Sequence, residues 1–225
     1  MNKQIRRTAA FFFLSFLCLT LITGCLGRTK PPFVMDQYSL DYSAPAASAS
    51  QAAQETIRVE RFAVSPAFNS TAMVVKKGQY RFDTYNYSRW RVNPADMVTG
   101  FVLRDITRAG IFKATYSYYD SDLSRYILEG YIDQFCESAE GSPGKALLSV
   151  RFTLIDTSQK NPVEQVVFQK QYTHSASMND RSPEGLAAAL SEAMKDLSGK
   201  LVSDINLSLQ GTPGNQRQPL TGQGF

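Results

Sequence analysis

Apolar positions along this chain of 225 residues follow two periods, which predict strands in some segments and helices in others. The segments 72–90, 124–138, 145–157 and 162–175 are rich in β-branched and aromatic residues, and each predicts strand structure. The segment 57–65 has the same character with one slip of the alternation, which is compatible with a bulge. In the segment 124–138, alternation places these residues on one face of the strand: Tyr126, Leu128, Gly130, Ile132 and Gln134.

Two helices are predicted from apolar stripes with a period of 3.6 residues. The first begins at Asn93-Pro94, because asparagine is a favourable N-cap and proline suits the first helical turn. Gly110 is predicted to end this helix. The second begins at Ser182-Pro183-Glu184 and is long and amphipathic.

The order of these elements predicts a single α/β (α+β) domain, in which a mixed sheet packs against two main helices. This domain is expected to span residues 57–209. Residues 25–56 are expected to be a flexible tether with a short strand near 38–42, because 46–55 is low in complexity. Residues 210–225 are rich in Gly, Pro and Gln and are predicted to be a disordered tail.

The first 24 residues have the organisation of a signal peptide. Basic residues Lys3, Arg6 and Arg7 precede an apolar run from Ala9 to Ile22, which is shorter than the about 20 residues that span a bilayer as a helix. The run ends in Leu-Ile-Thr-Gly-Cys, which resembles a bacterial lipobox. Cys25 is therefore predicted to become the acylated N-terminus of the mature protein. Leu26 follows it, and the absence of an aspartate there favours sorting to the periplasmic face of the outer membrane.

Charge and cysteine content change once the signal peptide is removed. The three basic residues that leave with it lower the formal net charge from +4 to +1, which removes the main argument for binding nucleic acid. Cys18 also leaves, and Cys25 carries lipid, so that Cys136 has no partner for an intramolecular disulfide. Cys136 is expected to be a buried apolar residue.

The sequence contains no pattern typical of a catalytic or metal site. His174 is the only histidine, no serine lies in a G-x-S-x-G motif, and the glycines of "GSPGK" are too close together for a phosphate-binding loop. We therefore predict a protein that is not an enzyme and needs no cofactor or metal. An enzyme built on carboxylates alone, or a solute-binding receptor, stays as a less favoured alternative.

The only tryptophan, Trp90, lies between Arg89 and Arg91 just before the first predicted helix. Two interpretations are open. Trp90 anchors that helix to the sheet, which is the favoured interpretation, or the three residues form a partner-binding surface, because tryptophan and arginine dominate interface energetics.

Several segments together resemble the family of auxiliary lipoprotein components of ABC-type transport systems. After the lipobox, Tyr38-Ser39-Leu40 matches the family's Tyr-x-Leu segment, and "IRVERFAVSP" matches a strand that ends near proline. The stretch 126–135, "YILEGYIDQF", fits the family's Y-x-L-x-G strand closely, and a C-terminal amphipathic helix completes the pattern. At residues 91–93, Arg-Val-Asn replaces the usual Ala-Glu-Pro.

This resemblance implies a lipoprotein that works with an ABC permease, an ATPase and an MCE-type lipid-binding protein. Together they would move phospholipids or other hydrophobic compounds between the envelope membranes, and the lipoprotein would dock the complex at the outer membrane. A homo-oligomer is also compatible with this role. The alternative is an accessory lipoprotein of envelope assembly or secretion.

Overall fold

The computed structural model describes residues 34–45, 53–121 and 124–211. By its internal contacts the chain divides into Met1–Val34 and Met35–Phe225, and the following account concerns the second unit. Its elements are β1 (Asp36–Tyr38), β2 (Ala53–Val59), β3 (Ala63–Val64), the short 3-10 helix η2 (Pro66–Phe68), β4 (Ala72–Lys77), β5 (Arg81–Trp90), α2 (Pro94–Ala109), β6 (Phe112–Ser117), β7 (Tyr126–Ser138), β8 (Lys145–Asp156), α3 (Pro162–Gln165), β9 (Val166–Ser177) and α4 (Pro183–Gly211). The predicted mixed α/β class with a single domain is confirmed.

Strand β7 organises the nine-stranded sheet. Along one edge it pairs with the antiparallel strand β8, which in turn pairs with β9. Along its other edge it pairs in parallel with β2, then β3, then β4, in the order in which these segments follow one another in the chain. Strands β5 and β1 extend the sheet beyond β4, and β6 lies outside β2.

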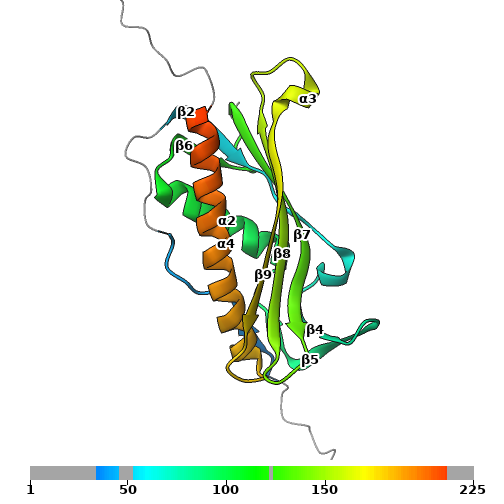
Figure 1. Ribbon diagram of the computed structural model, residues 1–225. Coiled ribbons are helices and arrows are strands. Elements are labelled where there is room, and N and C mark those ends of the chain that lie inside the picture. Colours follow the sequence, from blue (N-terminus) through cyan, green and yellow to red (C-terminus); the bar gives the residue numbers. More distant parts are fainter. Residues whose placement is uncertain (1–33, 46–52, 122–123, 212–225) are drawn as a thin grey trace, which may run out of the picture. The chain divides into compact units, whose positions relative to one another are not determined.

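Helices α2 and α4 cover one face of the sheet, and α4 runs along β8 and β9 (Figure 1). The apolar stripe predicted for the second helix is buried, with Leu186, Leu190, Leu197 and Leu201 each 2% exposed or less. The stripe meets alternate residues of β8, of which Leu148, Val150, Phe152 and Leu154 are fully buried. This layer forms the hydrophobic core.

The ends of α2 follow the predicted signals. The Asn93 side chain accepts a hydrogen bond from the backbone N–H of Ala95, and Pro94 occupies the first turn. Gly110 ends the helix with a φ of 64°, a left-handed conformation that glycine adopts without a Cβ penalty. The predicted start of α4 is also confirmed, since Ser182 Oγ accepts a hydrogen bond from the backbone N–H of Gly185.

The N-terminal boundary of the domain differs from the prediction. Strand β2 begins at Ala53 rather than at residue 57, and the early strand lies at Asp36–Tyr38 rather than near 38–42. Leu40 and Tyr42, which were assigned to the tether, are 4% and 8% exposed in the core. The tether prediction is wrong for these two residues, because nothing in the local sequence marks such isolated apolar positions as part of the core.

Three strand predictions also need correction. Strands β2 and β3 are separated by a break at residues 60–62 rather than joined through a bulge. Residues 162–165 form the short helix α3, capped by Asn161, before β9 begins. In β7 the register shifts between Ile132 and Gln134, so the alternation reverses there and Gln134 is not on the buried face with Tyr126.

A buried polar cluster joins the N-terminal segment to both long helices. Asp105 of α2 is 0% exposed, and its Oδ2 accepts hydrogen bonds from the hydroxyls of Tyr42, at 2.7 Å, and Ser198 of α4, at 2.6 Å. Arg104 donates from Nε to the other oxygen, Oδ1, at 2.8 Å. Burial, together with the bond to Asp105, raises the pKa of Tyr42, so its hydroxyl stays protonated and donates.

Cys25 and residues 212–225 of the predicted tail lie outside the described residues. Helix α4 itself extends to Gly211, two residues beyond the predicted end of the domain. Within the described part of the chain, no helix combines the length and apolar character needed to cross a membrane.

Candidate functional site

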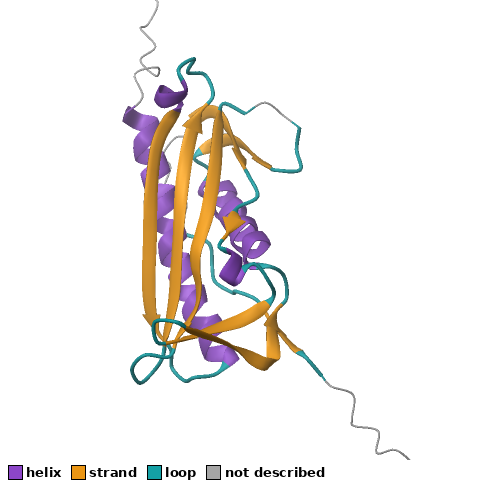
Figure 2. Cartoon of the chain, turned by 90° about the vertical axis from the view of Figure 1, so that its right-hand side faces the viewer, coloured by secondary structure: helices purple, strands orange, loops and turns teal. Residues whose placement is uncertain are grey.

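The sheet presents a second face that no described helix covers. Viewed from this side, β7, β8 and β9 lie in front of α4 (Figure 2). Because side chains alternate along a strand, the odd-numbered residues of β8 point to this outer face while the even-numbered residues are buried. The outer face is therefore a surface of regular structure that remains available to a ligand or a partner.

Polar side chains on the outer face hold one another in place. Gln171 of β9 donates from Nε2 to Asp133 Oδ2 at 2.8 Å and to Ser149 Oγ at 2.7 Å. The Ser149 hydroxyl also lies 3.1 Å from the Thr173 hydroxyl. Asp133 is the extra residue at the register shift of β7, so the bulge directs its carboxylate toward β9.

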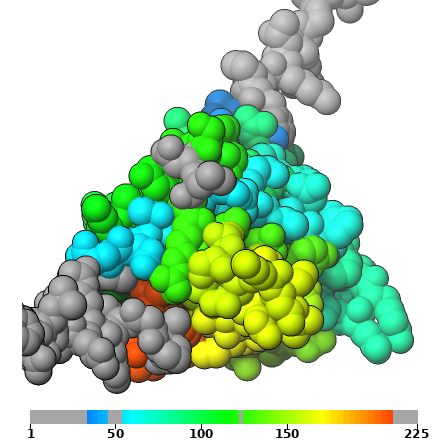
Figure 3. Space-filling view, turned by 90° about the horizontal axis from the view of Figure 1, so that it is seen from above, coloured from blue at the N-terminus to red at the C-terminus, as the bar shows by residue number. Residues whose placement is uncertain are grey.

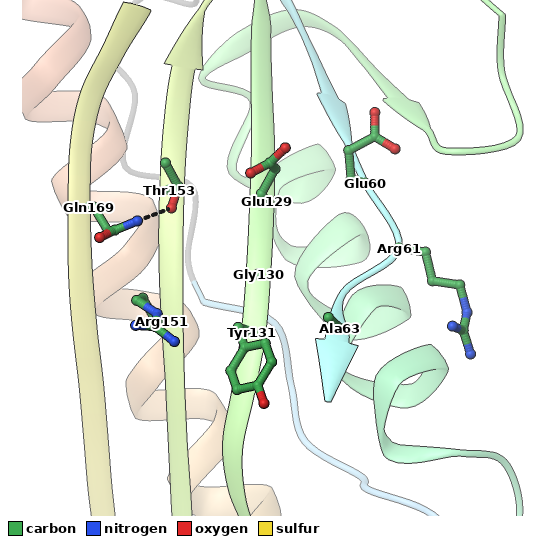
Figure 4. A pocket seen from close by; sticks show the side chains of 9 residues that line it. All are labelled: Glu60, Arg61, Ala63, Glu129, Gly130, Tyr131, Arg151, Thr153 and Gln169. Carbon is green, nitrogen blue, oxygen red and sulfur yellow. Dashed lines mark hydrogen bonds between the residues drawn. The ribbon is translucent and has the colours of Figure 1, made fainter. Parts of the chain in front are cut away.

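A groove of about 480 Å³ opens on this face where β7 and β8 meet the break between β2 and β3 (Figure 4). It is lined by residues from these strands and the break: Glu60, Arg61, Ala63, Glu129, Gly130, Tyr131, Arg151, Thr153 and Gln169. Gln169 Nε2 donates to Thr153 Oγ1 at 3.0 Å and closes one side of the groove. The groove is concave and lined by a mixture of charged, polar and aromatic side chains, which suits a segment of polypeptide.

The break that forms the groove depends on Phe62 and Gly130. Phe62 turns inward and packs edge-to-face on Phe152, with ring centroids 5.3 Å apart. A Cβ on Gly130 would lie 2.6 Å from the Phe62 ring, so only glycine admits this ring so close to β7. With Phe62 inside, the neighbouring residues Arg61 and Ala63 lie beside the outer side of β7.

Arg151 and Tyr131 are the groove residues best suited to contact a partner. The Arg151 guanidinium lies 5.4 Å from the centroid of the Tyr131 ring and 3.9 Å from Asp133 Oδ1, with 44% of its side chain exposed. Arginine and tyrosine in a concave site are the residue types that dominate interface energies. This pair therefore forms the centre of the candidate docking site, which we define as the nine groove residues.

Two charged residues at the rim, Glu60 and Arg61, form ion pairs with residues outside the groove. Glu60 accepts a hydrogen bond from Arg58 Nε at 2.7 Å. Arg61 points away from the groove in Figure 4 and donates to both carboxylate oxygens of Asp96, at 2.6 and 3.1 Å. This bond to Asp96 raises the pKa of Arg61 and keeps its charge at the surface of α2.

The groove is lined by two carboxylates, Glu60 and Glu129, but by no histidine or cysteine. Among the described residues, no three or more His, Cys, Asp or Glu side chains lie together in a way that could hold a metal ion. His174 lies outside the groove, with Nδ1 3.7 Å from Asp196 Oδ2. Cys136 is buried as predicted, and burial raises the pKa of its thiol to about 11, so the reactive thiolate is scarce at neutral pH.

The structure separates the three residues that the sequence grouped as a partner-binding surface. Arg89 and Arg91 are exposed, but Trp90 is 1% exposed and packs edge-to-face on Phe135, with ring centroids 5.1 Å apart. Trp90 is buried, as the favoured interpretation expects, and its ring is not part of the surface. Sequence reasoning missed Tyr131 and Arg151, although both fall on outward positions of predicted strands.

The segment of this chain that matches a known protein family covers the folded region described above. The family model for the ABC-type transport auxiliary lipoprotein component matches residues 38–202, from the end of β1 to the last turns of α4. The chain belongs to this family. Since the family consists of lipoproteins, the match implies a membrane-anchored protein in the periplasm.

Solved structures share the fold of this auxiliary lipoprotein. Protein XCC0632 from Xanthomonas campestris, of the DUF330 family, has 18% identity and a TM-score of 0.69, over 77% of this chain and 96% of that one. An uncharacterized protein has 11% identity and a TM-score of 0.59, over 76% and 99%. The hypothetical protein CT253 from Chlamydia trachomatis has 9% identity and a TM-score of 0.50, over 71% and 100%. At these identities the likeness establishes the fold alone. No curated protein matches the sequence.

Proposed function

We propose that this auxiliary lipoprotein is a non-enzymatic subunit of an ABC/MCE-type transport system, anchored to the outer membrane through Cys25. In this role it binds an MCE-type lipid-binding protein, which works with an ABC permease and an ATPase. The system moves phospholipids or other hydrophobic compounds between the envelope membranes. The observation that carries the proposal is the family match over residues 38–202, which covers nearly all of the described fold.

The candidate docking site supports action by binding. It combines a concave shape with an exposed arginine held against an aromatic ring, and its outer-face neighbours are ordered by hydrogen bonds before any partner arrives. Such preorganisation lowers the entropic cost of association. Arg89 and Arg91 form a competing surface, but their aromatic neighbour Trp90 is buried and offers no anchor to a partner.

The anchor is tested by changing the cysteine. Wild-type protein from the membrane fraction is expected to begin at Cys25 and to carry acyl chains, which intact-mass analysis measures. Cys25→Ala is expected to abolish lipid attachment, because no thiol remains, and to leave the uncleaved precursor. Density-gradient fractionation then locates the wild-type protein, and co-migration with inner-membrane markers or an unmodified soluble protein would contradict the proposal.

Docking is tested by pull-down of a purified MCE-type protein from the same bacterium. Tyr131→Ala combined with Arg151→Ala is expected to weaken binding about tenfold or more, because residues at the centre of an interface carry most of its energy. Both side chains reach the surface, so far-UV circular dichroism and the melting temperature are expected to stay near wild-type values.

The arginine pair supplies the matched comparison. Arg89→Ala with Arg91→Ala also removes surface side chains and is expected to bind nearly normally if the groove is the docking site. Loss of binding in this variant alone would assign docking to the arginine surface instead. A wild-type protein that captures no MCE partner, while envelope assembly fails in its absence, would favour the assembly or secretion alternative.

A further inference from the structure

The β4–β5 hairpin exposes three aromatic side chains, one of which, Phe82, also packs edge-to-face on Phe68 with ring centroids 6.3 Å apart. Tyr80 at the tip is 87% exposed, Phe82 is 50% exposed, and Tyr87 is 59% exposed. In Figures 1 and 3 the hairpin stands off from the rest of the sheet. Exposed aromatic residues gathered on a projecting element mark a surface that meets something less polar than water.

The same hairpin carries an excess of positive charge. Lys76, Lys77 and Arg81 lie at its outer end, where Asp83 is the one carboxylate of residues 76–83. Lys77 Nζ lies 2.6 Å from Asp83 Oδ2, an exposed pair, so Lys76 and Arg81 supply the unbalanced charge. Aromatic rings next to lysine and arginine are the composition that binds the interface of an anionic membrane.

The first described strand adjoins the hairpin, and the chain between this strand and Cys25 is long enough for the hairpin to reach the membrane. Strand β1 pairs with the end of β5, through Gln37 and Arg89. The chain from Cys25 to Asp36 spans at most about 40 Å when fully extended. From Arg89, the hairpin tip lies about 26 Å along β5 at the usual rise per residue. A tether of this length allows the hairpin to reach the bilayer that holds the lipid on Cys25.

We propose that the β4–β5 hairpin rests on the lipid surface of the membrane that holds the acylated Cys25. Tyr80 and Phe82 enter the headgroup layer, and Lys76 and Arg81 meet anionic headgroups. This inference rests on the lipid anchor of the proposed function and adds an orientation to it: the hairpin end faces the membrane. The outer face with the candidate docking site then stays open to the periplasm.

Exposed apolar residues at the opposite end of the sheet provide a contrast. Val163 of α3 is 82% exposed, and α3 lies at the other end of β8 and β9 from the hairpin (Figure 1). The exposed Lys160 and Glu164 beside it offset one another, so this end lacks the excess of positive charge that the hairpin carries. Val163 is therefore a control position of nearly the same exposure as Tyr80.

Tryptophan quenching tests the orientation in the full-length acylated protein. The protein is reconstituted in vesicles of phosphatidylcholine and phosphatidylglycerol that carry brominated acyl chains, whose bromine atoms quench indole rings in contact with them. Wild-type emission comes only from Trp90, which is buried and gives a constant background. Tyr80→Trp is expected to lose at least about half of its added emission, because aromatic rings settle at the interface. Val163→Trp is expected to keep its added emission.

Each other outcome overturns a defined part of the proposal. Unquenched emission from Tyr80→Trp, in protein that mass analysis shows to be acylated at Cys25, overturns the hairpin contact and leaves the anchor standing. Quenching of Val163→Trp in place of Tyr80→Trp reverses the orientation. A chain without acyl groups overturns the anchor, and the orientation with it. Adding Arg81→Glu to Tyr80→Trp is expected to weaken the quenching. Unchanged quenching would show that the cationic side chains do not contribute to the membrane contact.

Discussion

Asp105→Ala is expected to lower the free energy of unfolding by about 3–5 kcal/mol, the range for breaking a buried charged pair. The carboxylate is fully buried, and it accepts hydrogen bonds from Tyr42, Ser198 and Arg104. Removing it leaves two buried hydroxyl donors without their acceptor, and each orphaned group costs free energy because water cannot reach it. Urea unfolding followed by Trp90 fluorescence measures the change.

Asp96→Ala is the matched control, because Asp96 is the same residue type on the same helix. Its carboxylate pairs with Arg61, but both side chains are more than a third exposed, at 38% and 47%. Exposed ion pairs contribute at most about 1 kcal/mol, so this variant is expected to unfold close to the wild-type urea midpoint. If Asp105→Ala and Asp96→Ala lowered the free energy of unfolding equally, the buried cluster would not join the N-terminal segment to α2 and α4 as described.

Trp90→Ala is expected to cost about 3–5 kcal/mol, the usual range for removing a buried large aromatic side chain. Trp90 is 1% exposed at the end of β5, just before α2, and packs on Phe135 of β7. The variant therefore leaves a cavity between the end of β5 and the central strand β7. Urea unfolding followed by far-UV circular dichroism is the appropriate measurement, because the only tryptophan is lost.

The flanking arginines supply the control for Trp90. Arg89→Ala with Arg91→Ala changes two exposed positions on either side of it and is expected to stay within about 0.5 kcal/mol of the wild type. A Trp90→Ala variant as stable as this double variant would place the indole ring outside the core. The comparison also separates stability from docking, since both sets of residues were candidates for the same surface.

The sequence by itself determined the elements whose signals are local. Asn93 and Gly110 fixed the ends of α2 because a cap needs only the residues beside it. The stripe of α4 followed from its period, and so did the main strands of the sheet. The lipobox and the order of short motifs were enough to identify the family, which the match over residues 38–202 confirmed.

Local signals did not reveal where a strand changes face or where a segment joins the core. The alternation of β7 predicted Gln134 on the buried face, but the bulge at Asp133 depends on pairing with β8 and has no sequence signal of its own. Leu40 and Tyr42 were assigned to the tether for the same reason. Tyr42 meets Asp105, 63 positions away, and only folding brings such residues together.

The tertiary structure alone decided which residues form the candidate docking site. Tyr131 and Arg151 lie on different strands, and the groove exists because β2 and β3 break beside β7, where Phe62 turns inward onto Gly130. The same pairing of distant segments buried Trp90 and left its two arginines exposed. Caps and periodicity depend on residues a few positions apart, whereas a surface depends on strands that approach from distant parts of the chain.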